Sequence, residues 1–366
     1  MKKNLFVIAM VVLLAIFAIS CENETVKIVG VETKEALLAA VGDGTKAIYL
    51  KNDIAVNDYI DINKGQTLTI DLNGKTIDLG NGSISINYQG TGEGGSLSVV
   101  GKGTIKSVGD KTFDITGSAS LEKDTMSYLS IGKDVTVEGP INVYNADGAS
   151  ASYGVKVEIY GTIKGKQPLY VNGTIKNTEK APMIHIHENA KIEDLGDGGI
   201  YIAGYAKVIV DKANITSNGN ALVLCAGEAE INGATIVGGT EYGTSPSVGG
   251  SITSELSSAI YIKQHTTNLP VKVVVNSGKF SGYIPFYQTK GQNSSPAPDK
   301  VALEIKGGEF TCTSTTADKV AVKSADKTGF ITGGLFSEKP ADAYIAEGYK
   351  AVEAGTGWEV AKKSAE

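Results

Sequence analysis

Residues 200–236 read IYIAGYAKVIVDKANITSNGNALVLCAGEAEINGATI, and they contain two copies of one unit. Each copy consists of three short apolar pieces. In the first copy they are Ile200–Ile202, Val208–Val210 and the anchor Ile215. In the second copy they are Leu222–Leu224, Ala229–Ile231 and the anchor Ile236. Alternation of side chains along a strand turns the outer two residues of each triplet inward and the middle residue outward. The stretch therefore predicts three short strands per unit.

The same unit recurs along most of the chain. The third-piece anchors are separated by 21 to 30 residues, with one longer interval of 44, and they are Ile163, Ile192, Ile215, Ile236, Phe280, Phe310 and Phe336. A supersecondary unit repeated at such a period is typical of a solenoid. Three strands per coil, each stacked on its predecessor, predict an all-β fold, a right-handed parallel β-helix solenoid with a short N-terminal capping helix.

Two glycine-glycine-x-phenylalanine phrases, Gly307–Phe310 and Gly333–Phe336, accompany these repeats. With them, the chain resembles the pectate-lyase-like β-helix superfamily over nearly the whole of its mature part, which excludes the first twenty residues. A terminal coil has one face without a neighbour, so both ends of the array are expected to carry caps. We expect the β-helix over residues 31–340, a capping helix at about 33–41, and a C-terminal capping segment over 341–366.

The beginning of the chain predicts export. Two lysines precede an apolar run over residues 5–19, which is short for a membrane-spanning helix. The run ends in Ala18-Ile19-Ser20-Cys21, which resembles the cleavage box of bacterial lipoproteins. This resemblance implies that residues 1–20 are a lipoprotein signal peptide, that Cys21 is lipidated, and that residues 21–30 form the anchor and tether. A plain signal peptide with an incidental cysteine is the alternative.

The composition excludes some function classes. The 366 residues carry 34 basic and 40 acidic side chains, for a net charge of −6, and every basic residue is lysine. Without arginine, no mechanism that needs a guanidinium is available. The acidic balance gives no electrostatic footprint for nucleic acid, so no nucleic-acid partner is expected. Cys225 and Cys312 fall on strands several coils apart, too far for a disulfide.

Polygalacturonase-like hydrolases, which share the β-helix scaffold that this chain resembles, carry Asn-Thr-Asp, Asp-Asp, Gly-His-Gly and Arg-Ile-Lys motifs. None of these four motifs occurs in this sequence. The remaining candidates for catalysis are a weak local group, His185, His187, Lys191, Glu193 and Asp194. Two histidines at alternate strand positions suit a metal ion, and the acids leave calcium open as a cofactor. The structural alternative is that His187 continues a column of corner residues formed later by Asp211, Asn232 and Asn276, which bond turn backbone groups.

The ligand-binding candidates are tyrosines. Tyr170, Tyr201 and Tyr261 are middle residues of first pieces, so stacking at about 4.8 Å predicts an exterior stripe. Short connections beside Tyr205, flanked by longer ones, predict a notch next to Tyr201. Such a stripe suits sugar rings, because tyrosine offers both an aromatic face and a hydroxyl. The alternative is that these side chains pack along the sheet.

Together these observations favour a non-catalytic, lipid-anchored protein of the bacterial cell envelope, surface-exposed and monomeric. Its expected role is that of an adhesin or glycan-binding rod, with the membrane as partner through Cys21 and with polysaccharide or host or matrix glycans as ligands. The alternative is an exported polysaccharide lyase or glycoside hydrolase acting on an acidic glycan. A structural spacer of the envelope that binds nothing specific is a third reading.

Overall fold

The computed structural model describes residues 27–63, 65–88, 93–118, 126–145, 154–173, 178–196, 198–240, 247–248, 252–253, 257–291, 300–317 and 319–364. The expected signal peptide, Cys21 and most of the tether lie outside these residues. Within them, no helix is long and apolar enough to cross a membrane.

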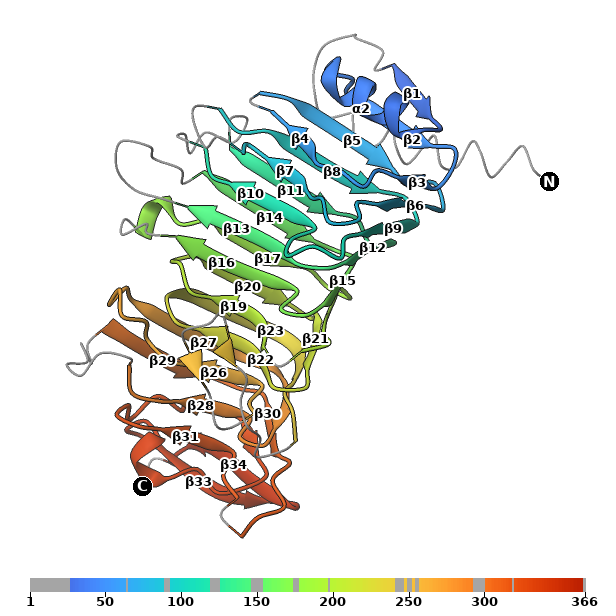
Figure 1. Ribbon diagram of the computed structural model, residues 1–366. Coiled ribbons are helices and arrows are strands. Elements are labelled where there is room, and N and C mark those ends of the chain that lie inside the picture. The colour runs from blue at the N-terminus through green and yellow to red at the C-terminus, as the bar shows by residue number, and fades with distance from the viewer. Residues whose placement is uncertain are drawn as a thin grey trace.

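The protein is a parallel β-helix, which confirms the predicted all-β solenoid (Figure 1). Each coil contributes one strand to each of three parallel ladders. The first ladder contains β4 (Ile60–Ile62), β7 (Ile84–Ile86), β10 (Phe113–Thr116), β13 (Ile141–Asn145), β16 (Leu169–Gly173), β19 (Gly198–Ile202), β22 (Asn220–Leu224), β26 (Ile260–Ile262), β28 (Phe286–Gln288) and β31 (Val322–Ser324).

The second ladder contains β1 (Ile28–Val31), β2 (Ala47–Leu50), β5 (Thr67–Asp71), β8 (Ser96–Val100), β11 (Ser127–Ile131), β14 (Val155–Ile159), β17 (Met183–Ile186), β20 (Lys207–Asp211), the first parts of β23 (Gly227–Val237) and β27 (Val271–Gly282), and β29 (Val301–Ile305). The third contains β3 (Ile54–Ala55), β6 (Lys75–Asp78), β9 (Gly103–Lys106), β12 (Val135–Glu138), β15 (Thr162–Gly165), β18 (Lys191–Asp194), β21 (Asn214–Ser217), the second parts of β23 and β27, β30 (Glu309–Cys312) and β32 (Leu335–Phe336). A separate antiparallel pair joins β24 (Ser247–Val248) and β25 (Ile252–Thr253).

The core is a column of inward-facing apolar side chains, because register-matched strands place equivalent residues above one another. All seven predicted third-ladder anchors are buried. Toward the C-terminus the anchors become aromatic, and the ring of Phe310 stacks between those of Phe280 and Phe336, with centroids 4.8 and 4.9 Å away. Of the two described cysteines, Cys225 is buried, Cys312 is half-buried, and both are free thiols.

Different structures close the two ends of the described array. At the N-terminal end, α2 (Lys34–Gly42) buries Leu37 and Val41. The Thr33 hydroxyl accepts a hydrogen bond of 3.2 Å from the backbone N–H of Ala36, one of the free donors in the first turn of the helix. At the other end, β33 (Tyr349–Ala354) and β34 (Gly357–Lys362) form an antiparallel hairpin, and β34 pairs with β32. Two short 3₁₀ helices, η1 (Thr178–Lys180) and η3 (Asp342–Tyr344), lie in connections.

Candidate functional site

The middle residues of the first-ladder strands form one continuous row on the outside of the sheet. In register order they are Asp61, Ser85, Asp114, Asn142, Tyr170, Tyr201, Val223, Tyr261, Tyr287 and Lys323. The row is polar in its first four members and mainly apolar in the next five. The predicted tyrosine stripe is therefore the second half of a longer row.

The tyrosines of this row point outward as predicted, but they are buried or half-buried, so they pack along the sheet rather than forming an exposed stripe. Tyr201 and Tyr261 are only 3% and 2% exposed, and they form a small apolar cluster with Val223 and Cys225. Burial raises the pKa of the Tyr201 hydroxyl. Tyr170 is half-buried, and burial raises its pKa to about 12. The physical reason is that a side chain that points away from the coil interior is still covered when the residues above and below it in the row pack against it.

Tyr205 does not line an open notch either. Its ring is buried in a cluster with Ala181, Ala226 and Leu269. Its hydroxyl donates a hydrogen bond of 2.7 Å to a Glu228 carboxylate oxygen, and burial together with this bond raises its pKa. Parts of the long connections expected to border the notch, residues 146–153, 174–177 and 292–299, lie outside the described residues.

An open groove instead lies over the polar half of the row. It has a volume of about 480 Å³, within the range of ligand sites in proteins. Its lining includes Ser83, Ser85, Asp61 and the half-buried Asp114. Two further lining residues, Tyr59 and Tyr88, are 62% and 70% exposed. Exposed aromatic side chains beside carboxylates and hydroxyls combine an apolar face with hydrogen-bonding groups.

Asp114 is held rigidly in this groove. One of its oxygens accepts a hydrogen bond of 2.7 Å from the Lys111 ammonium, and the other accepts one of 2.6 Å from the Asn142 amide. The carbonyl oxygen of Asn142 is in turn 3.4 Å from the amide nitrogen of Asn172. These bonds fix the orientation of Asp114 and Asn142 before any ligand arrives.

A second groove, of about 970 Å³, adjoins the first and shares Asp110 and Lys111 with it. It follows the turns that connect third-ladder strands to first-ladder strands, and Tyr170 and Tyr201 lie at its far side. The row from Asp61 to Tyr201 crosses six strands, which corresponds to about 24 Å at a strand spacing of about 4.8 Å. The two grooves together form an elongated surface rather than a single deep pocket.

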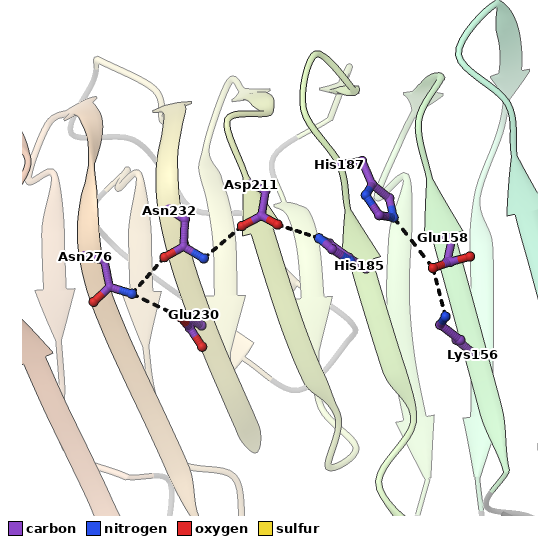
Figure 2. A network of polar contacts seen from close by, with 8 residues as sticks. All are labelled: Lys156, Glu158, His185, His187, Asp211, Glu230, Asn232 and Asn276. Carbon is purple, nitrogen blue, oxygen red and sulfur yellow. Dashed lines mark hydrogen bonds and ion pairs between the residues drawn. The ribbon is translucent and has the colours of Figure 1, made fainter. Parts of the chain in front are cut away.

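The histidine group lies elsewhere, on the second ladder (Figure 2). His185 is the outward residue of β17, and its Nε2 is 2.6 Å from a carboxylate oxygen of Asp211. His187 follows the same strand, and its ring stacks on those of His185 and Tyr160 with centroids 3.7 and 3.8 Å away. Burial, and then the neighbouring His185, lower the pKa of His187. On the other side of His187 lies Glu158 of β14. Desolvation is the largest single effect on the pKa of Glu158 and raises it, but the hydrogen bonds from Tyr128 and Lys156 together outweigh desolvation, so the pKa is lowered.

The remaining candidates, Lys191, Glu193 and Asp194, belong to β18 of the third ladder and are not gathered with the histidines. Asp194 is 4% exposed and is used as a structural acceptor. One oxygen accepts the backbone N–H groups of Gln167 and Gly196, each at 3.0 Å, and the other accepts the Ser217 hydroxyl at 2.7 Å. Three of the roughly four acceptor sites of this buried carboxylate are therefore occupied by structural hydrogen bonds. Asp197, a third acid close to Glu193 and Asp194 in the sequence, lies outside the described residues.

Among the described residues, a single group brings three potential metal ligands within 4.8 Å of one another, and it is Glu158, His185 and His187. It combines the two predicted histidines with an acid that sequence reasoning did not select. Glu158 stands opposite His185 in the pairing of β14 with β17, so strand alignment across one coil was the signal that would have found it.

Comparisons with known proteins add no family. No protein-family model matches the chain, and no curated protein or solved structure matches it either. The fold and the two surface sites are therefore the basis for assigning a function.

Sequence reasoning also missed the groove residues Tyr59, Asp61, Tyr88, Lys111 and Asp114. A signal for the two aspartates was present, because Ile60-Asp61-Ile62 and Phe113-Asp114-Ile115 repeat the inward-outward-inward triplet of Ile200-Tyr201-Ile202. Tyr59 and Tyr88 lie just outside their triplets, where no periodicity constrains the direction of the side chain.

Proposed function

We propose that this protein is a non-catalytic, lipid-anchored surface protein that binds a neutral glycan along the elongated groove of the first ladder. The observation that carries the proposal is the pairing of two strongly exposed tyrosines, Tyr59 and Tyr88, with an ordered row of carboxylate, amide and hydroxyl groups. Aromatic rings of this kind stack on the apolar faces of sugars, and the polar row satisfies their hydroxyls.

The charges of the groove support a neutral rather than an acidic ligand. Its first part contains three acids, Asp61, Asp110 and Asp114, against one lysine, Lys111. Two lysines of its second part are already paired, Lys106 with Asp78 and Lys164 with Glu138, each at 2.9 Å. A polyanion would therefore meet repulsion in the first part and few unpaired cations in the second.

The test is a binding measurement on a panel of neutral and acidic polysaccharides. We expect Tyr59→Ala and Tyr88→Ala each to weaken binding of a neutral polymer by about 1–3 kcal/mol, a range known for base–aromatic stacking that we apply here by analogy. Tyr144→Ala is the matched control, since Tyr144 is 41% exposed on the same ladder but lies outside both grooves. Equal binding by all three variants and the parent would refute the site.

Anchoring is the second part of the proposal. The Ala18-Ile19-Ser20-Cys21 box supports lipidation of Cys21 and a position at the surface of the bacterial envelope. The β-helix would then project from the membrane, with the groove on the coils nearest its anchored end. Mass spectrometry of the N-terminus tests this directly: we expect a diacylglyceryl-modified Cys21, and an unmodified or differently cleaved N-terminus would refute the anchor.

One observation favours a second candidate, an inverting glycoside hydrolase. Asp61 and Asp114 lie in the same groove two strands apart, about 9.6 Å between backbones at the usual strand spacing. Inverting enzymes place two carboxyl groups about 6.5–9.5 Å apart. Both Asp114 oxygens already have partners, which favours binding over catalysis. The hydrolase would be established instead if the protein releases new reducing ends from any polymer, both with calcium and with chelator, and if Asp61→Asn abolishes this release.

A further inference from the structure

The corner of the second ladder carries a column of polar side chains that is interrupted at His187 (Figure 2). The Asn276 amide donates to the Asn232 oxygen at 2.7 Å, and the Asn232 amide donates to Asp211 at 2.8 Å. The next corner residue is His187, but Asp211 bonds to His185 instead, at 2.6 Å. The expected continuation of the column is thus broken, and His187 is left out of it.

The imidazole of His187 has no hydrogen-bond partner at Nε2, although that nitrogen is buried. The nearest acceptor is a Glu158 oxygen at 3.8 Å, which is too long for a hydrogen bond. The ring is nevertheless fixed, because Tyr160 stacks on it with planes only 9° apart. Buried polar atoms are nearly always paired, so an orphan nitrogen held in place indicates a missing partner.

The neighbouring groups show what kind of partner fits. The ligand atoms of Glu158, His185 and His187 lie within 4.8 Å of one another. Zinc binds nitrogen and oxygen at about 2.0–2.2 Å, so two ligands on one ion are at most about 4.4 Å apart. Small side-chain rotations close that difference. Two imidazoles and one carboxylate favour zinc-class ions over calcium or magnesium, which prefer oxygen ligands alone.

We propose that Glu158, His185 and His187 bind a divalent transition-metal ion of the zinc class, leaving an open coordination position. This site is on a different ladder from the glycan groove, and the two proposals are independent. Three protein ligands with an open position are the arrangement of a zinc ion that also accepts water or an external ligand.

Outer contacts already orient two of the three ligands. Asp211 accepts the hydrogen bond of His185 Nε2, which leaves Nδ1 for the ion. The Tyr128 hydroxyl donates to one Glu158 oxygen at 2.6 Å. A carboxylate behind a ligating histidine and a donor behind a ligating carboxylate are common supports of metal sites.

Lys156 makes the proposal sharply testable. Its ammonium is 2.9 Å from the Glu158 oxygen that faces His187, so it competes with an ion for that oxygen. Replacing this lysine by methionine removes the competing charge and keeps an unbranched side chain that is only one atom shorter. A metal site predicts tighter binding in Lys156→Met, whereas a purely structural ion-pair cluster predicts a less stable protein and no metal response.

The experiment titrates the full chain, without a histidine tag, with Zn²⁺ by calorimetry and with Co²⁺ by visible absorption. We expect one ion per chain, no cobalt–thiolate charge-transfer band, and loss of saturable binding in His187→Gln and Glu158→Gln. Tyr128→Phe should weaken binding about 10- to 100-fold, and Lys156→Met should strengthen it roughly tenfold.

His265→Gln is the matched control, because His265 is the third histidine of the chain and lies in a separate connection. We expect it to bind Zn²⁺ like the parent. Circular dichroism confirms that each variant is folded. The proposal is overturned if the folded parent shows no saturable binding, if His187→Gln retains it, or if His265→Gln abolishes it.

Discussion

Asp194 is the residue whose replacement best separates a structural from a catalytic role. It was a sequence candidate for catalysis, yet its buried carboxylate accepts three hydrogen bonds from Gln167, Gly196 and Ser217. Gln167 has a backbone φ of 50°, in the left-handed region that costs non-glycine residues about 1–3 kcal/mol. The carboxylate therefore links the strained turn at Gln167, in the preceding coil, to Ser217 in the following coil.

The magnitude follows from these three bonds. In Asp194→Ala, two backbone N–H groups and one hydroxyl lose their acceptor, and each buried unsatisfied group costs about 1–3 kcal/mol. Because the Ser217 hydroxyl rotates freely, we expect a total loss of about 3–5 kcal/mol in the free energy of unfolding. In Asp194→Asn, the amide oxygen still accepts both N–H groups and the amide N–H₂ donates to the Ser217 oxygen, so we expect a loss of only about 1 kcal/mol.

Urea denaturation followed by circular dichroism measures both losses from the transition midpoint and slope. Glu193→Ala is the control, because Glu193 is the preceding residue on β18 but is half-buried on the outer face. We expect it to change stability by less than about 0.5 kcal/mol. If Asp194→Ala is no more destabilising than Glu193→Ala, or if Asp194→Asn is as harmful as Asp194→Ala, the hydrogen-bond reasoning is wrong.

Three further outcomes are expected. Phe310→Ala should lower the free energy of unfolding by about 3–5 kcal/mol in urea, because it opens a cavity between two stacked rings; a loss below about 1 kcal/mol would contradict the stacked core. Gly227→Ala should lower the melting temperature, because the backbone φ of Gly227 is 88° and an added Cβ would lie 2.2 Å from the Ala206 carbonyl oxygen. Gly42→Ala, where an added Cβ meets open space, should leave the melting temperature unchanged. Desolvation by burial raises the pKa of Asp71 above its ordinary 3.8, so ionisation of this carboxyl destabilises the fold as pH rises through the higher pKa. Asp71→Asn should therefore be more stable than the parent at pH 7 and lose this advantage below pH 3.8. The shift is refuted if variant and parent have the same melting temperature at both pH values.

The repeat could be predicted in detail because strand alternation is a local property. Ile163, Ile192, Ile215 and Ile236 are all fully buried, as the period-two pattern requires. The N-terminal helix expected at about 33–41 is likewise present as Lys34–Gly42, and its capping group is Thr33. In each case the deciding contacts lie within a few residues of the chain or one coil away.

The sites were harder to predict because they depend on contacts between coils. The pattern that correctly turned Tyr201 and Tyr261 outward could not show that they are covered, because exposure depends on what packs over a sheet. His187 was expected to continue the column of Asp211, but its ring stacks on Tyr160 and Asp211 bonds to His185. An imidazole is larger than an amide and has its own stacking partner, which no corner alignment reveals.

The sequence by itself determined the coil, its three strands, its inward anchors and the helix that covers its first turn, since each follows from alternation and spacing along the chain. Only the tertiary structure decided which outward residues are accessible and which groups meet across strands. It placed Glu158 beside the two histidines and the groove over the polar half of the first ladder, because residues about 25 to 30 positions apart in sequence become neighbours at a strand spacing of about 4.8 Å.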